Sequence, residues 1–175
     1  MASGFPAPAG GAADRGRVVR RRPRDEAALF NPAFLGVLLS VASNEYERRR
    51  SQPLPYPLAF VVLPLVLASD VRSVLPRTTQ AYFAKWVSNQ PTVRVEMPIR
   101  SRATAPYARE AIRFGLRYGM LELVGARLRG SFRAPSAVRR FQGETVDIVR
   151  QAAFVGRWLA PEEPVQIFAL FGMRP

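Results

Sequence analysis

The 175-residue chain contains no cysteine and no histidine, which excludes disulfides, thiolate nucleophiles, imidazole bases and metal sites built on either residue. Its 13 Asp and Glu residues are mostly isolated, so we expect a protein that is not an enzyme and that holds no cofactor and no metal. The net charge of +13, carried almost entirely by arginine, favours phosphate backbones, acidic protein surfaces or anionic lipid as partners.

The first 27 residues have the composition of a disordered basic tail. Residues 1–13 are rich in Ala, Gly and Pro, and six arginines follow between Arg15 and Arg24. Such a segment has too little apolar surface to offset the entropy of ordering, and no apolar stretch follows it as in a secretory signal. Contact with nucleic acid and a solvated leader are both compatible with this tail. Residues 28–175 are predicted to form a single domain.

Two helices are predicted at the start of this domain. Asn31 is a good N-cap and Pro32 a good first residue, so a helix is expected over Pro32–Arg49. The stretch Leu58–Ala68 is apolar all round, but it is shorter than the ~20 residues of a membrane span and contains Pro64. We interpret it as a buried helix, kinked or broken at Pro64, at the hydrophobic centre of a protein with no membrane partner.

The middle of the chain is less regular. Asp70–Leu75 indicates a short helical turn, and a helix is expected from Thr78 or Thr79 to about Gln90. Thr92–Met97 is typical of a short strand or an extended link. The segment from residue 98 to residue 103 fits no single element.

A clear pattern returns at Pro106. Tyr107–Tyr118 is predicted to be a helix that ends at Gly119, and Met120–Phe132 a β-hairpin with its turn at Gly125. A helix that leads directly into a hairpin is the second half of a winged helix-turn-helix. The predicted fold is therefore mainly α, a helical domain with a winged helix-turn-helix-like element.

Arginines recur at helical spacing within this element. Arg109, Arg113 and Arg117 fall on one stripe of the predicted helix, opposite its apolar face. The predicted DNA-binding surface adds arginines of the hairpin region and comprises Arg109, Arg113, Arg117, Arg127, Arg129 and Arg133. A solvated helix face is the alternative, and winged helices also serve as protein–protein modules.

The last part of the chain is predicted to contain a long helix, Glu144–Leu159, and a short one at about Pro164–Leu170. The apolar residues of the C-terminal segment either pack back onto the core or dock on a partner. The candidate partner interface consists of Ile167, Phe168, Phe171 and Met173. The expected core consists of Phe34, Leu38, Phe60, Leu63, Leu67, Trp86, Ile112 and Leu116.

Several stretches, in the same order along the chain, resemble the middle-component family of bacterial three-component ABC ATPase systems. They are residues 29–34, 57–67, 75–79, 106–116 and 167–175. The resemblance implies a small winged-helix adaptor, encoded beside an SMC-like ABC ATPase and an effector. Such systems are thought to act in defence against phages and plasmids, with a logic that Lamassu-type systems share.

The function expected from this resemblance is that of a cytoplasmic, non-catalytic adaptor subunit in a hetero-oligomer. It would link the SMC-like ATPase to an effector such as a nuclease, with contact to double-stranded DNA. The family supplies no catalytic residues to transfer. The alternative is a free-standing winged-helix transcriptional regulator, which explains the charge and the hairpin equally well.

Overall fold

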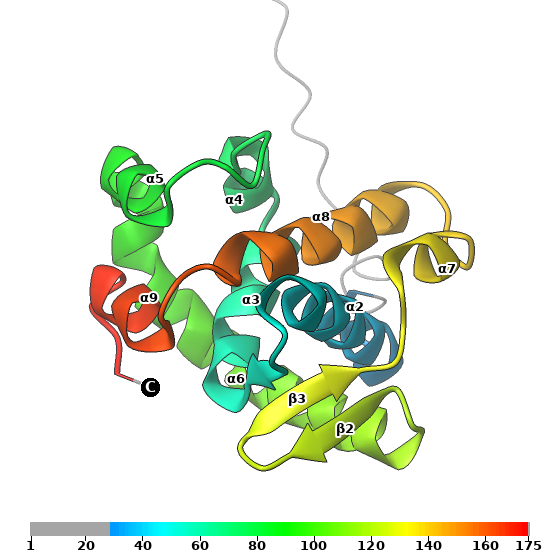
Figure 1. Cartoon of the computed structure of the whole chain (residues 1–175). Helices are drawn as coiled ribbons and strands as arrows, with labels where there is room; N and C mark the ends of the chain where they lie inside the picture. Colours follow the sequence, from blue (N-terminus) through cyan, green and yellow to red (C-terminus); the bar gives the residue numbers. More distant parts are fainter. Residues whose placement is uncertain (1–28, 175) are drawn as a thin grey trace, which may run out of the picture.

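The computed structural model describes residues 29–174, and the predicted tail, residues 1–27, lies outside this range (Figure 1). The helices are α2 (Pro32–Arg50), α3 (Ala59–Leu67), α4 (Ser69–Val74), α5 (Phe83–Asn89), α6 (Pro91–Arg117), α7 (Ala134–Val138), α8 (Glu144–Leu159) and α9 (Pro164–Leu170). A three-stranded antiparallel sheet contains β1 (Leu54–Pro55), β2 (Leu121–Val124) and β3 (Arg127–Gly130). The mainly helical fold class is therefore confirmed.

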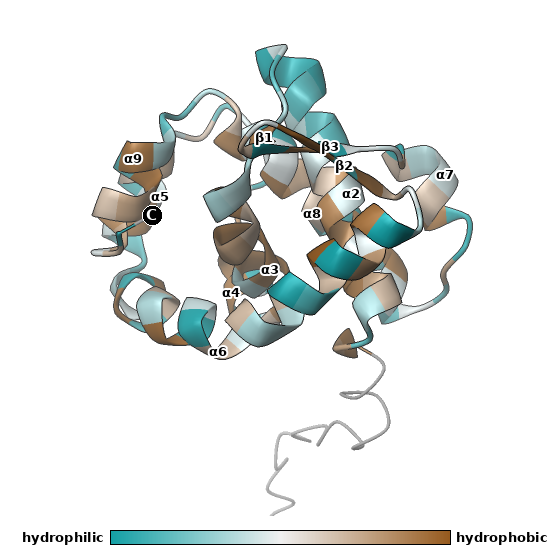
Figure 2. Ribbon diagram, turned by 90° about the horizontal axis from the view of Figure 1, so that it is seen from below, coloured by the Kyte–Doolittle hydropathy of each residue, from teal (hydrophilic) through white to brown (hydrophobic). Residues whose placement is uncertain are grey.

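Helix α2 lies at the centre of the fold. Every residue from Phe34 to Ser43 is buried, and the helix packs chiefly against α8 and α6. Its first turn is capped as predicted, since the Asn31 side chain accepts a hydrogen bond of 2.8 Å from the Ala33 amide. Hydrophobic residues also fill α3, in the middle of the molecule (Figure 2).

Two neighbours of α2 approach its backbone at glycines. A methyl group on Gly156 of α8 would lie 2.2 Å from the Ala42 carbonyl oxygen, and one on Gly130 of β3 would lie 1.8 Å from that of Ser40. The Ser40 hydroxyl donates a 2.6 Å hydrogen bond to the Met120 carbonyl. These contacts fix α8 and the sheet against α2 with little freedom to shift.

The predicted hairpin is confirmed and gains a third strand. Leu123 of β2 and Leu54 of β1 both pair with Leu128 of β3, so the strand order is β1-β3-β2. The turn contains Gly125 at a φ of 59°, a conformation that glycine adopts without strain. Strand β1 is only two residues long and ends in Pro55, so it has no alternating pattern from which the sequence could predict it.

The segment before the hairpin differs most from expectation. Thr92–Met97, predicted as a strand or link, forms the first turns of α6, which continues unbroken through Pro98 and Pro106. Each proline frees the carbonyl four residues earlier, at Arg94 or Arg102. Both of these residues are exposed, so water can satisfy the freed carbonyls. The helix predicted to begin near Pro106 therefore begins about four turns earlier, at Pro91, and the predicted start was wrong.

Other boundaries show smaller differences. Helix α3 runs through Pro64 without a break, and α5 begins at Phe83 rather than at Thr78 or Thr79. The short helix α7 was not predicted. Both α8 and α9 have the predicted bounds. None of the helices within residues 29–174 combines the length and apolar character needed to cross a bilayer.

Most of the predicted core residues are buried, but two are not. Leu116 is 37% exposed, and Phe60 is only partly buried. Leu116 lies beside the buried stripe of α6 rather than on it. The remaining six, which are buried as predicted, are Phe34, Leu38, Leu63, Leu67, Trp86 and Ile112.

A cluster of aromatic rings joins α5 and α8 to Phe171, the residue that follows α9. Phe83 meets Trp158 and Phe171 edge-on, with ring centroids 5.0 and 5.6 Å apart. The indole of Trp158 donates a 2.7 Å hydrogen bond to the Ala81 carbonyl. In α2, the Tyr46 hydroxyl is buried without a partner among the described residues, and burial raises its pKa.

Replacing Leu63 with Ala should lower the free energy of unfolding by about 2–5 kcal/mol, since the side chain is fully buried in α3. Urea denaturation followed by circular dichroism measures the change. Val165→Ala is the control, because that side chain is 70% exposed and its loss should cost less than about 0.5 kcal/mol. Equal effects of the two substitutions would contradict this description of the core.

Candidate functional site

The last three turns of α6 carry the predicted arginine stripe. Arg109, Arg113 and Arg117 are exposed, whereas Ala108 and Ile112 on the opposite side are buried. Successive arginines are four residues apart, slightly more than one helical turn, which is about 6 Å along the axis. None of these three arginines forms an ion pair with a carboxylate in residues 29–174, so their charges are available to a ligand. We call these three residues the α6 ridge.

Aromatic rings accompany the α6 ridge. The guanidinium of Arg109 lies 5.8 Å from the centroid of the Phe60 ring, and that of Arg117 lies 5.8 Å from that of Tyr118. Arg113 and Arg117 border a shallow hollow of about 290 Å³ that also contains Glu110. The ridge thus combines guanidinium forks with aromatic surface, a combination suited to phosphate and to nucleic acid.

The arginines of the hairpin region are not equivalent to those of the ridge. Arg129 is paired with Glu47 at 3.0 Å and with Glu122 at 3.2 Å, and its pKa is raised chiefly by the hydrogen bond to Glu47. Arg127 donates a 3.1 Å hydrogen bond to the Pro53 carbonyl, which ties the hairpin to the segment before β1. Both arginines thus help to hold the sheet in place, and the charge of Arg129 is balanced by neighbouring carboxylates, whereas Arg127 has no ion pair within the described residues.

Arg133, the last residue of the predicted DNA-binding surface, is exposed in the link between β3 and α7. It forms no ion pair within the described range. The structure therefore places the three α6 arginines together as one unpaired stripe, whereas among the arginines of the hairpin region only Arg129 is engaged in ion pairs within residues 29–174.

The candidate partner interface at the C-terminus is mostly internal. Ile167, Phe168 and Phe171 are at most 5% exposed and pack into the core of this same chain. Met173 is half-buried and lines a groove of about 310 Å³ together with Phe60 and other residues. The sequence left two alternatives for this apolar segment, packing onto the core or docking on a partner. Ile167, Phe168 and Phe171 pack onto the core, so they are not free to dock on a partner.

A buried carboxylate that the sequence analysis did not select joins α2 to α8. The Glu45 side chain is 4% exposed, and its two oxygens accept from Arg48 at 3.1 Å and from Arg157 at 2.9 Å. With Arg49, these residues line a hollow of about 280 Å³, which we call the Glu45 hollow. Sequence alone gave no signal for it, because Arg157 is far from Glu45 along the chain.

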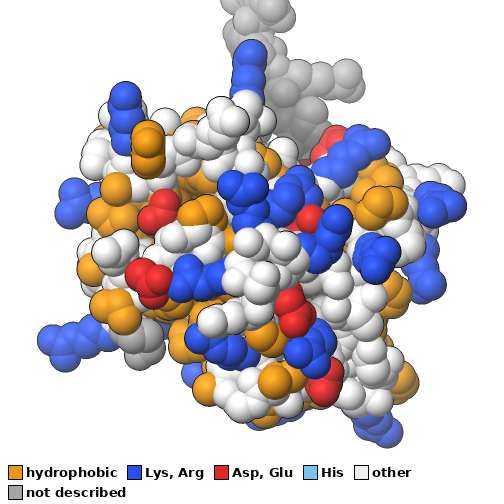
Figure 3. All heavy atoms as spheres, in the orientation of Figure 1, with side chains coloured by type: hydrophobic (Ala, Val, Ile, Leu, Met, Phe, Trp, Pro, Cys, Tyr) orange, Lys and Arg blue, Asp and Glu red, His pale blue; other side chains and the backbone are white. Residues whose placement is uncertain are grey.

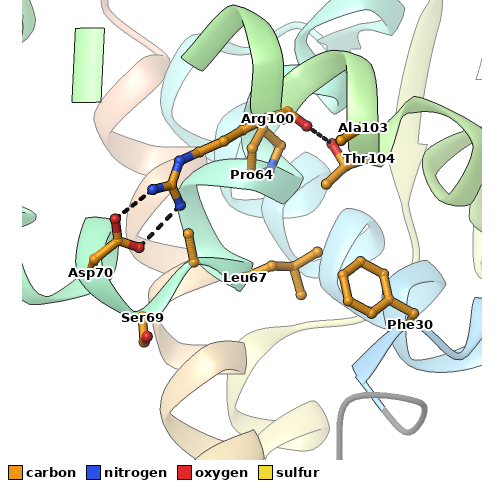
Figure 4. A pocket seen from close by; sticks show the side chains of 9 residues that line it. Phe30, Pro64, Leu67, Ser69, Asp70, Arg100, Ala103 and Thr104 are labelled. Atoms are coloured by element: carbon orange, nitrogen blue, oxygen red, sulfur yellow. Dashed lines mark hydrogen bonds and ion pairs between the residues drawn. The ribbon is translucent and has the colours of Figure 1, made fainter. Parts of the chain in front are cut away.

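A different hollow, of about 340 Å³, lies beside Phe30 and between α4 and α6 (Figure 4). At its edge, both Nη atoms of Arg100 contact the Asp70 carboxylate, at 3.0 and 2.6 Å, and Arg100 also contacts Glu96. Burial would raise the pKa of Asp70, but the hydrogen bond and charge of Arg100 outweigh it and hold the pKa below its usual value. Because these polar groups already pair with one another, the hollow offers a ligand mainly apolar surface.

The described residues contain no group of three or more Asp or Glu side chains placed to hold a metal ion. The arrangement instead offers basic surfaces with unpaired guanidinium groups, on a small helical domain with a three-stranded sheet. The fold and its charge define the class of small, basic, mainly helical domains.

Comparison with known families assigns the chain to one family. Residues 19–175 match the family model of the ABC-three component (ABC-3C) system Middle Component 3, so the chain belongs to this family and is a middle component of a three-component ABC system. The match begins ten residues before Leu29 and so includes part of the basic segment. No curated protein matches the chain. No solved structure matches it either.

Glu45→Gln should lower the free energy of unfolding by about 1–3 kcal/mol, because two charge-assisted hydrogen bonds between α2 and α8 are weakened. Glu110→Gln is a matched control, since that carboxylate is exposed and forms no ion pair within residues 29–174. Urea titrations of the two variants measure the difference. A Glu45 variant as stable as the control would show that the carboxylate does not hold the two helices together.

Proposed function

We propose that the chain is the non-catalytic adaptor of its ABC-three component system. In this function it links the SMC-like ABC ATPase to an effector, such as a nuclease, in a cytoplasmic complex that defends bacteria against phages and plasmids. Family membership supports the proposal, because a middle component belongs to a system with other components. It also favours the adaptor over a free-standing transcriptional regulator.

In this proposal the complex contacts double-stranded DNA through this chain. The single observation that supports the DNA contact is the α6 ridge. Arg109, Arg113 and Arg117 are exposed, aligned and free of ion pairs within the described range. Arginine donates two parallel hydrogen bonds to phosphate oxygens, and a single-signed stripe matches the charge of a DNA strand. Phosphate contacts of this kind position a protein on DNA without reading its sequence.

The order of the elements supports a winged-helix interpretation of this surface. A helix and a short strand, α2 and β1, precede α3, and α6 leads directly into the hairpin whose strand β3 pairs with β1. In a winged helix, the helix before the hairpin faces DNA. The chain departs from the usual pattern because α4 and α5 lie between α3 and α6, where a helix-turn-helix has a turn of about 3–4 residues.

Changing Arg113 and Arg117 to Glu should weaken duplex binding by the assembled complex about equally for all DNA sequences. The slope of log affinity against log salt concentration should become shallower by about 2, since each of the two lost phosphate contacts contributes about 0.9 to it. Fluorescence anisotropy with a labelled duplex at several salt concentrations measures both quantities. The control is a variant with Arg77 and Arg94 changed to Glu, which alters the net charge equally at exposed positions.

If the ridge variant and the control bind DNA alike, the ridge is only a solvated face and the DNA contact is refuted. If the ridge variant keeps its DNA affinity but no longer joins the other components, the ridge docks acidic protein instead. The adaptor function would then stand without the DNA contact.

A further inference from the structure

We propose that the Glu45 hollow is a docking site for an acidic side chain of another component of the system. The inference rests on the proposed adaptor function and assigns one surface to that function. It concerns Glu45, Arg48, Arg49 and Arg157, where α2 ends against α8.

The Glu45 hollow has a surplus of positive charge. Three guanidinium groups surround one carboxylate, and Arg49 is exposed without an ion pair in residues 29–174. The nearby carboxylates do not reduce this surplus. Glu47 pairs with Arg129 at 3.0 Å, and Glu163 pairs with Arg50 at 2.6 Å.

Glu45 orients the guanidinium groups for a second anion. It engages one Nη1 atom of Arg48 and one of Arg157, which are 62% and 39% exposed. Each guanidinium keeps further N–H donors, because arginine carries five. Holding two arginines in place before a ligand arrives reduces the entropy lost on binding, which favours a specific contact over a diffuse one.

The hollow and the α6 ridge lie on different sides of the molecule. Helix α2 is buried on all sides from Phe34 to Ser43 and packs against both α6 and α8, so the outward faces of these two helices are separated by the core. Figure 3 shows the face that carries α8, with basic side chains gathered over it. A duplex bound along the α6 ridge is therefore not positioned to contact the Glu45 hollow as well.

The surroundings of the hollow favour a compact acidic group over a DNA strand. A phosphate backbone presents a continuous line of charge and calls for an extended single-signed surface. Along α8, however, Arg150 pairs with the exposed carboxylate of Asp147 at 3.2 Å, so the charge beyond the hollow is mixed. A projecting Asp or Glu side chain of a protein partner fits a local cluster of three guanidinium groups.

Arg49→Glu tests the proposal without removing either arginine that pairs with Glu45. With the purified ATPase and effector components as probes, biolayer interferometry should show about a tenfold weaker affinity for one of them. Duplex affinity of the same variant should stay within about twofold of the wild type. Arg102→Glu, an equal charge change at an exposed position on α6, should leave the protein affinities unchanged.

A loss of duplex affinity with unchanged protein affinity would overturn the proposal and make the hollow a nucleic-acid site. Unchanged affinity for all probes would overturn it as well, while the adaptor function would stand if the wild type binds both components. If the wild type binds neither component, the adaptor function fails and this inference fails with it.

Discussion

The close packing of other elements around α2 is the constraint on which the rest of the structure depends. Backbone contact with α2 is possible for α8 and β3 only because Gly156 and Gly130 have no side chain. Helix α6 packs against α2 as well, through a face of small and apolar residues that includes Ala108 and Gly115. Because α2 is buried on all sides from Phe34 to Ser43, an unpaired charge there would lose its hydration, and the arginines of the neighbouring helix α6 accordingly lie on its exposed face.

This arrangement divides the arginines of a strongly basic chain into two groups. Arg50, Arg127 and Arg129 bind carbonyls or carboxylates of the same domain and hold loops and strands in place. The arginines of the α6 ridge, and Arg49 at the Glu45 hollow, have no ion pair within the described residues. Arg77, Arg94, Arg102 and Arg133 are exposed without an ion pair in this range as well. The α6 ridge differs because three such charges share one helix face, and the Glu45 hollow differs because Arg49 lies with two arginines held by Glu45. Two such surfaces suit a middle component that meets more than one partner.

Local signals in the sequence predicted much of the fold, because caps, glycine stops and periodicity act within a few residues. They located α8, α9, the hairpin and the start of α2. They failed for the start of α6, where β-branched residues and two prolines indicate a break but tertiary packing of one face keeps the helix intact. They also failed for Arg129 and for Glu45, whose partners lie far away in sequence. The stripe on α6 was predictable because all of its members share one helix.

The central claim is that the two basic surfaces serve two different partners, and site-specific cross-linking tests it most directly. Because the chain has no cysteine, a photoreactive maleimide attached to a single introduced cysteine labels one position only. We predict that a label at Gln52→Cys, near Arg49, cross-links to a protein component of the assembled complex, and that one at Glu110→Cys, beside the α6 ridge, cross-links to duplex DNA. Cross-links from both positions to the same partner would contradict the account.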